Sequence, residues 1–141
     1  MSTSNNTVIL TGNMTKDLEL RFTNNGTPVA NGRVAVTDRF TTRDGDLRER
    51  TTYVNFVLWG DLAMHAAESV GKGSHISLRG RLDIREYEVN GERRYSTEIV
   101  AVDIAPSLRW AAATVERQPV GVGAVKTDDR GEVYGNDSEP F

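Results

Sequence analysis

The chain has 141 residues, of which 38% are hydrophobic and none is cysteine, and its 17 basic and 20 acidic residues leave a net charge of −3. This length fits one domain with a tail, and the lack of cysteine excludes disulfides and thiolate metal sites. No apolar run approaches the roughly 20 residues of a membrane helix. No basic-then-apolar secretion signal precedes the first predicted strand. We therefore expect a cytoplasmic protein without membrane contact.

The excess of acidic residues lies near the C-terminus. Residues 1–110 carry 14 basic and 14 acidic residues, whereas residues 111–141 carry 3 and 6. A folded domain without net charge does not attract nucleic acid in general. Binding therefore requires basic side chains that are concentrated on one face. We expect a folded domain over residues 1–117 and a disordered tail with an acidic tip over residues 118–141, where no hydrophobic period remains.

The first part of the chain predicts two strands joined by a connector. Thr7–Met14 is apolar on both parities, which fits either an interior strand of one barrel or a strand that also meets another subunit. Lys16–Gly26 ends in the turn signal Asn-Asn-Gly and predicts the connector. In Pro28–Phe40, alternation turns Arg33 outward and places Phe40 on the core side, unless a bulge or the strand end swings it out.

A hydrophilic stretch, Thr41–Arg50, separates this strand from the next one. It carries Arg43, Arg48 and Arg50. The pattern predicts a hairpin loop, which is either only solvated or wraps a strand of nucleic acid with its cations.

The strand predicted over Thr51–Trp59 alternates cleanly and still turns aromatic rings outward. Phe56 and Leu58 share the parity of a core face, whereas Tyr53 and Trp59 lie on the opposite parity. Half-buried strands normally expose polar residues on that side. We therefore interpret the two rings as a surface on which nucleobases stack.

One helix is predicted, over Leu62–Val70. Asp61 is placed to cap its N-terminus and Gly71 to end it. Apolar residues at i, i+4 and i+8 form a narrow stripe, which suits a helix that closes the end of a small barrel.

The following strand, His75–Tyr87, combines an apolar face with a basic face that ends in an aromatic ring. The apolar parity carries Ile76, Leu78, Gly80, Leu82 and Ile84. The opposite parity carries His75, Ser77, Arg79, Arg81, Asp83, Arg85 and Tyr87. Rings for bases and guanidinium groups for phosphates indicate a binding surface for an unpaired nucleic-acid strand.

An Asn90-Gly91 turn signal leads into a fifth strand, Arg94–Ala105, and Pro106 interrupts it. Residues 108–115 are either a sixth short strand or an extension. Five strands with a helix between the third and fourth are typical of the all-β OB-fold barrel, with an SH3-like barrel as the alternative.

With these patterns in place, the chain resembles the bacterial single-stranded DNA-binding protein (SSB) family over about residues 5–110. The matching segments are V-I-L-T-G-N (8–13), D-L-E-L-R-F (17–22), G-T-P-V-A-N (26–31), Y-V-N-F-V-L-W (53–59), L-A-M-H-A-A-E-S-V-G-K-G-S (62–74), L-R-G-R-L (78–82) and Y-S-T-E-I-V (95–100). P-S-L-R-W-A-A-A-T-V (106–115) is similar to the extension of high-GC Gram-positive members, in which an added strand clamps neighbouring subunits.

The resemblance implies a homotetramer that binds single-stranded DNA without regard to sequence and protects it in DNA replication, recombination and repair. A protein-interaction module and an RNA-binding relative are the alternatives. The family's stacking aromatics fall on Phe40, Tyr53, Trp59 and Tyr87. The phosphate contacts that we expect are Arg33, Lys72, Arg79, Arg81 and Arg85, with Arg48, Arg50 and Arg94 as further candidates.

The C-terminal tip resembles the family's as well. Members end in an acidic run, an aliphatic residue, Pro and Phe, and this tip binds replication and repair proteins. Asp137, Glu139, Pro140 and Phe141 match, although Glu139 replaces the aliphatic residue and the acids are few.

No motif in the chain indicates catalysis. His65 and His75 have no carboxylate or second histidine at metal-ligand spacing, and Gly73 separates Lys72 from Ser74, unlike in a phosphate-binding P-loop. A serine elbow and a nucleotide-binding glycine loop are also missing. We expect a binding protein without enzymatic activity, metal or cofactor.

Overall fold

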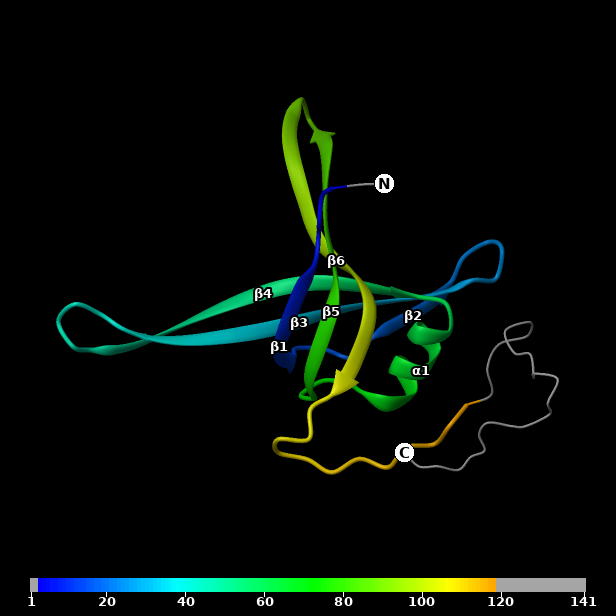
Figure 1. The fold of residues 1–141 in the computed structure, drawn as a ribbon. Helices are drawn as coiled ribbons and strands as arrows, with labels where there is room; N and C mark the ends of the chain where they lie inside the picture. Colours follow the sequence, from blue (N-terminus) through cyan, green and yellow to red (C-terminus); the bar gives the residue numbers. More distant parts are fainter. Residues whose placement is uncertain (1–2, 119–141) are drawn as a thin grey trace.

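The alternating segments form six strands and one helix in a computed structural model that describes residues 3–118. The tip predicted at residues 137–141 and almost all of the tail lie outside the described residues. The elements are β1 (Val8–Met14), β2 (Glu19–Phe22), β3 (Pro28–Thr41), β4 (Leu47–Trp59), α1 (Asp61–Ser69), β5 (His75–Val89) and β6 (Glu92–Pro106) (Figure 1).

Five of the strands close into a barrel. The sheet runs in the order β1-β5-β6-β4-β3, and β1 pairs with β3 at Asn13↔Ala35 and Met14↔Val34 to complete the ring. The β4–β6 pair is parallel and the other pairs are antiparallel. Because α1 lies between the third and fourth barrel strands, this order confirms the predicted OB fold.

Strand alternation places the core inside this ring. Phe56, Leu58, Ile76 and Leu78 are fully buried or nearly so, as their parity predicts. Ala63 and Ala66 of α1 pack on the same core, and the helix closes one end of the barrel (Figure 1). No helix in residues 3–118 has the length and apolar character that a membrane crossing requires.

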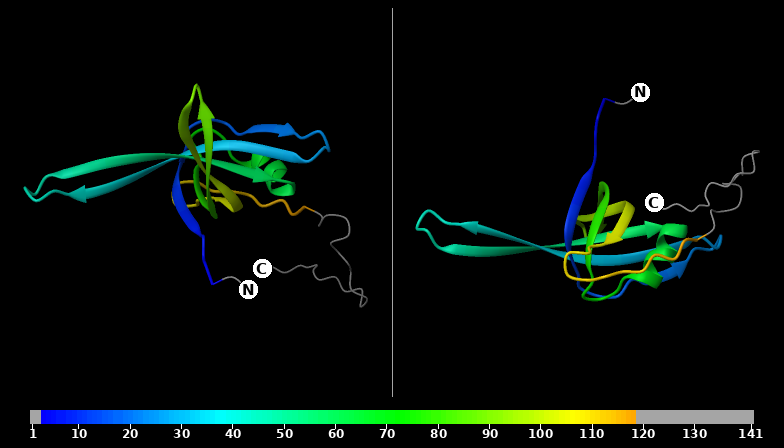
Figure 2. Two further views of the ribbon diagram at one scale, coloured as in Figure 1. Left: turned by 90° about the horizontal axis from the view of Figure 1, so that it is seen from above. Right: turned by 60° about the horizontal axis from the view of Figure 1, so that its bottom comes forward.

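Two hairpins extend well beyond the barrel in different directions, β3–β4 and β5–β6 (Figures 1 and 2). This explains one wrong prediction. Leu82 and Ile84 share the parity of the core face, yet they are 38% and 54% exposed. At their level β5 has passed the last partner of β1, Val8↔Gly80, so no second layer covers them.

The sequence-based boundaries need three corrections. The connector predicted over residues 16–26 contains β2, which pairs with β3 from Glu19↔Asn31 to Phe22↔Pro28. The loop predicted over residues 41–50 is mostly strand, because β3 and β4 stay paired to Thr41↔Leu47. Arg48 and Arg50 are therefore strand residues.

The third correction concerns α1. Gly60 is the N-cap and Asp61 is the first helical residue, without a side-chain capping bond. In that first turn its carboxylate still interacts favourably with the helix dipole. Residues 107–118 form no strand in the described chain, so of the two readings of residues 108–115 the structure shows an extension.

Candidate nucleic-acid interface

A groove of about 550 Å³ crosses the outer face of the barrel, lined by residues of β2, β3, β4, β5 and β6 and by Thr23 just after β2. Its floor is apolar and consists of Val29, Val57 and Val100. Val57 has the outward parity but is buried, and it lies between Asn31 of β3 and Val100 of β6 on the same face. Such a floor can carry the flat face of a base without demanding a hydrogen bond from it.

Strand register places polar and aromatic side chains around this floor. One row runs Asn31↔Val57, Val57↔Val100 and Val100↔Arg81 across four strands. Directly opposite residues of paired strands share a face, so the exposed Arg81 lies at the β5 end of the row. No ion pair within residues 3–118 occupies its guanidinium, which leaves it available for a phosphate.

The adjacent row joins Arg21, Val29 and Trp59. Trp59 is 49% exposed and lines the groove, as its parity predicts. Arg21 lies on the opposite wall, where its Nη2 donates a 2.8 Å hydrogen bond to Oδ1 of Asn31. The groove thus has an aromatic ring beside its apolar floor and cations on both walls.

Tyr53 continues the aromatic surface along β4, two residues beyond Asn55. Its ring is 56% exposed, and the guanidinium carbon of Arg33 lies 5.1 Å from the ring centroid. This distance is typical of a cation–π contact. The pair offers a flat ring and a cation together on the outward side of β3 and β4.

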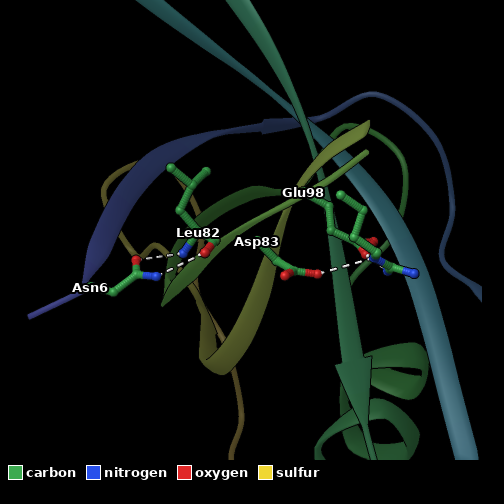
Figure 3. A network of polar contacts seen from close by, with 5 residues as sticks. Asn6, Leu82, Asp83 and Glu98 are labelled. Atoms are coloured by element: carbon green, nitrogen blue, oxygen red, sulfur yellow. Dashed lines mark hydrogen bonds and ion pairs between the residues drawn. The ribbon is translucent and has the colours of Figure 1, made fainter. Parts of the chain in front are cut away.

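Arg85 also lines the groove, but two carboxylates hold it. Its Nε lies 3.3 Å from Oδ2 of Asp83, and its Nη2 lies 2.9 Å from Oε1 of Glu98. Figure 3 shows Asp83 and Glu98 side by side at the strand pair β5–β6. The predicted phosphate contact therefore has internal partners in the free protein.

The remaining candidates lie away from the groove lining. Phe40 keeps the parity of Val34 and Val36 without any bulge, but it is 47% exposed because the β3–β4 hairpin has left the barrel there. Arg48 pairs opposite Phe40, and Arg50 shares that face. This face is opposite to the one that carries Tyr53.

The β5–β6 hairpin carries Tyr87 and Arg94 opposite each other, on the parity of Arg85. Arg94 forms an ion pair with Glu92 at 3.2 Å. Arg79 lies beside Ile9 of β1, and Lys72 lies in the turn before β5, where its backbone N–H donates to Asp17. The structure therefore separates Arg79 and Lys72 from the groove.

Sequence reasoning missed Arg21 and Phe22 on β2, Asn31 on β3, and the two carboxylates at Asp83 and Glu98. A signal existed for β2, because Leu18, Leu20 and Phe22 alternate with polar residues. A signal existed for the carboxylates as well, because a two-residue Asn90-Gly91 turn sets Val89 opposite Glu92 and therefore Asp83 opposite Glu98.

The histidines lie outside the groove lining. His75 contacts Asn13 through a ring nitrogen, and its ring packs edge-on against Trp110 with centroids 4.6 Å apart. Within residues 3–118, no cluster of three or more His, Asp or Glu side chains is arranged to hold a metal.

Comparison with known proteins shows which family shares these features. The model of the single-strand binding protein family matches residues 5–107. The single-stranded DNA-binding protein of Paenarthrobacter aurescens is 40% identical over 114 residues, which cover 79% of this chain and 67% of the relative. That of Mycolicibacterium smegmatis is 39% identical and covers 79% and 69%. The Corynebacterium glutamicum protein is 37% identical over 86% of this chain and 55% of its own length.

Solved structures agree with this result. The single-stranded DNA-binding protein of Thermus aquaticus superposes with a TM-score of 0.67 at 30% identity, over 74% of this chain and 51% of that one. A Plasmodium falciparum SSB in complex with single-stranded DNA gives a TM-score of 0.71 over 76% and 98%, and at 20% identity it supports the fold alone. With its OB barrel and a family match over residues 5–107, the chain belongs to the single-strand binding protein family.

Proposed function

We propose that this protein binds single-stranded DNA across the groove, with bases stacked on aromatic side chains and phosphates held by arginines. The observation that carries the proposal is the arrangement of the groove lining. Trp59 lies beside the apolar floor, with Arg21 on one wall and Arg81 on the other. Stacking and phosphate contacts require no particular base, so binding tolerates any sequence. The proposed role is to protect exposed strands during replication, recombination and repair, without catalysis.

The proposal extends to the surroundings of the groove. Phe40 and Tyr87 on the two hairpins, with their neighbouring cations, would carry the strand beyond the barrel. We also propose a homotetramer, a domain boundary near residue 117, and binding of replication and repair proteins by the tip at residues 137–141. A protein with these partners works in the nucleoid-containing cytoplasm.

Fluorescence of Trp59 tests the stacking. The chain has two tryptophans, so Trp110→Phe leaves Trp59 as the only one. We expect oligo-dT to quench the emission of this variant, because a stacked base contacts the indole face. A duplex of equal length should quench far less, since its bases are already paired and stacked. Emission that does not respond to oligo-dT would contradict the proposal.

The salt dependence of binding tests the two wall cations. For single strands, log affinity falls with log salt at a slope of about −0.7 for each neutralised phosphate. Arg21→Ala and Arg81→Ala should each make the slope shallower by about 0.7. Arg93→Ala is the matched control, because Arg93 pairs opposite Glu88 on the other face of the β5–β6 hairpin and should leave the slope unchanged. If all three variants show the same slope, the DNA does not contact Arg21 or Arg81.

A further inference from the structure

Arg33 differs from several of the other candidate cations in what its side chain contacts. Arg85 and Arg94 form ion pairs with carboxylates, whereas the guanidinium of Arg33 forms no ion pair with residues 3–118. Its central carbon lies 5.1 Å from the centre of the Tyr53 ring, over the face of that ring. The sequence predicts a phosphate contact at Arg33, but the partner that the structure gives this side chain is an aromatic ring.

Strand register explains why the two side chains meet. Arg33 pairs opposite Asn55, and Tyr53 pairs opposite Ala35, so Arg33 and Tyr53 are diagonal neighbours on the outward face of β3 and β4. Diagonal neighbours are about 7–8 Å apart, which is within reach of a long side chain and a ring. Because Ala35 offers only a methyl group across from the ring, the space over the ring is open to the guanidinium.

The Tyr53 ring has little support from the strand on its other side. The β4–β6 pairing runs from Asn55 to Val57, so within the described part of the chain no residue of β6 is paired with Tyr53. The ring is 56% exposed. An exposed side chain without packed neighbours samples several rotamers, and immobilising it on binding lowers affinity. The guanidinium of Arg33 restricts the ring before any DNA binds.

The contact still leaves the ring accessible to a base. An aromatic ring has two faces, and the guanidinium covers one of them. The other face remains for a base, because more than half of the tyrosine is exposed. Base, ring and guanidinium would then form one continuous stack. A planar guanidinium suits this position, whereas the ammonium of lysine is a compact and strongly hydrated charge.

We propose that Arg33 is a positioning residue for Tyr53, which holds the ring in the orientation in which a base stacks on it. Arg33 therefore acts on DNA through the ring and not through a phosphate. This inference rests on the proposed binding of single-stranded DNA. It requires that the contribution of Arg33 to affinity disappears when the Tyr53 ring is removed.

A double-mutant cycle on the full chain tests this requirement. Affinity for oligo-dT is measured by fluorescence anisotropy at one salt concentration, for Arg33→Ala and Tyr53→Ala separately and together. With Tyr53 present, Arg33→Ala should weaken binding about three- to fivefold, the size of an exposed cation–π contact. In the Tyr53→Ala background, the same change should have no measurable effect. An equal fold-change in both backgrounds would overturn the inference, because a phosphate contact does not depend on the ring.

Arg33→Lys tests the same point with the positive charge retained. A contact to a single phosphate tolerates lysine, whereas a stacked guanidinium is not replaced by it. Arg33→Lys should therefore lose most of the affinity that Arg33→Ala loses. If Arg33→Lys binds oligo-dT as tightly as the unaltered protein, Arg33 acts as a point charge and the inference is wrong.

Arg39→Ala is the matched control, because it removes the same charge from the same face of β3. Arg39 lies opposite Glu49 and forms an ion pair with it at 3.0 Å, away from Tyr53. Its effect on affinity should be the same with and without Tyr53→Ala. A coupling as large as that of Arg33 would show that charge in general is measured, which would overturn the inference. If the unaltered protein does not bind oligo-dT at all, the proposed function itself fails.

Discussion

Alanine at both Tyr53 and Trp59 is expected to weaken binding of oligo-dT by about 2–6 kcal/mol, which corresponds to roughly 30-fold to more than 10⁴-fold in affinity. Each ring stacked on a base contributes about 1–3 kcal/mol. Both rings are about half exposed on the outward face of β4, so their removal leaves no cavity in the core. Anisotropy of a labelled oligonucleotide measures the loss, and thermal unfolding monitors the fold.

Tyr95→Ala provides the matched control for this double variant. Tyr95 is an exposed strand tyrosine that pairs opposite Glu86, on the face of the β5–β6 hairpin that Asp83 and Arg85 do not share. Its removal should leave affinity unchanged within about threefold, which is about 0.65 kcal/mol. An equal loss of affinity in Tyr95→Ala, or full affinity in the double variant, would show that the DNA does not bind along β4.

Alternation in the sequence was sufficient to predict which side of β4 faces the core. The segment 51–59 places Phe56 and Leu58 inside and the rings of Tyr53 and Trp59 outside, as the structure has them. The reason is local, since successive side chains of any strand point to opposite faces. The order of strands and helix in the sequence likewise predicts the OB barrel.

The same rule failed for Leu82, Ile84 and Phe40, because parity gives a direction and says nothing of what covers it. β5 is 15 residues long, and only its first part has a β1 partner. Beyond that point every side chain of β5 is exposed except the half-buried Asp83. The length of a strand relative to the barrel depends on tertiary structure, so a local pattern could not predict the exposure of these side chains.

The pairing of Arg85 with two carboxylates was not predicted, although the sequence contains the information for it. Strand alternation places Arg85 on the groove face, and this position alone predicts a phosphate contact. Its partner Glu98 is 13 residues away and meets it through the β5–β6 register, which the two-residue Asn90-Gly91 turn sets. A one-residue change of that register would turn Glu98 to the other face and leave the guanidinium with Asp83 alone.

Replacing Phe56 with alanine is expected to lower the free energy of unfolding by about 3–5 kcal/mol. Phe56 is fully buried at the centre of the barrel and lies opposite Gly32. A Cβ at Gly32 would come within 2.5 Å of the Phe56 ring, so β3 carries a glycine there to make room for it. Because five hydrogen-bonded strands form a closed ring around the site, the barrel cannot collapse into the vacated space.

Urea denaturation at a fixed protein concentration measures this loss, because any assembly of subunits makes stability depend on concentration. Phe40→Ala makes the same chemical change at a position that is 47% exposed on the β3–β4 hairpin, and its stability should stay within about 0.5 kcal/mol of the unaltered protein. The contrast isolates burial from residue type. Similar losses in the two variants would mean that Phe40 packs against something in solution, such as a second subunit, and would relocate this ring from the proposed DNA surface to a protein interface.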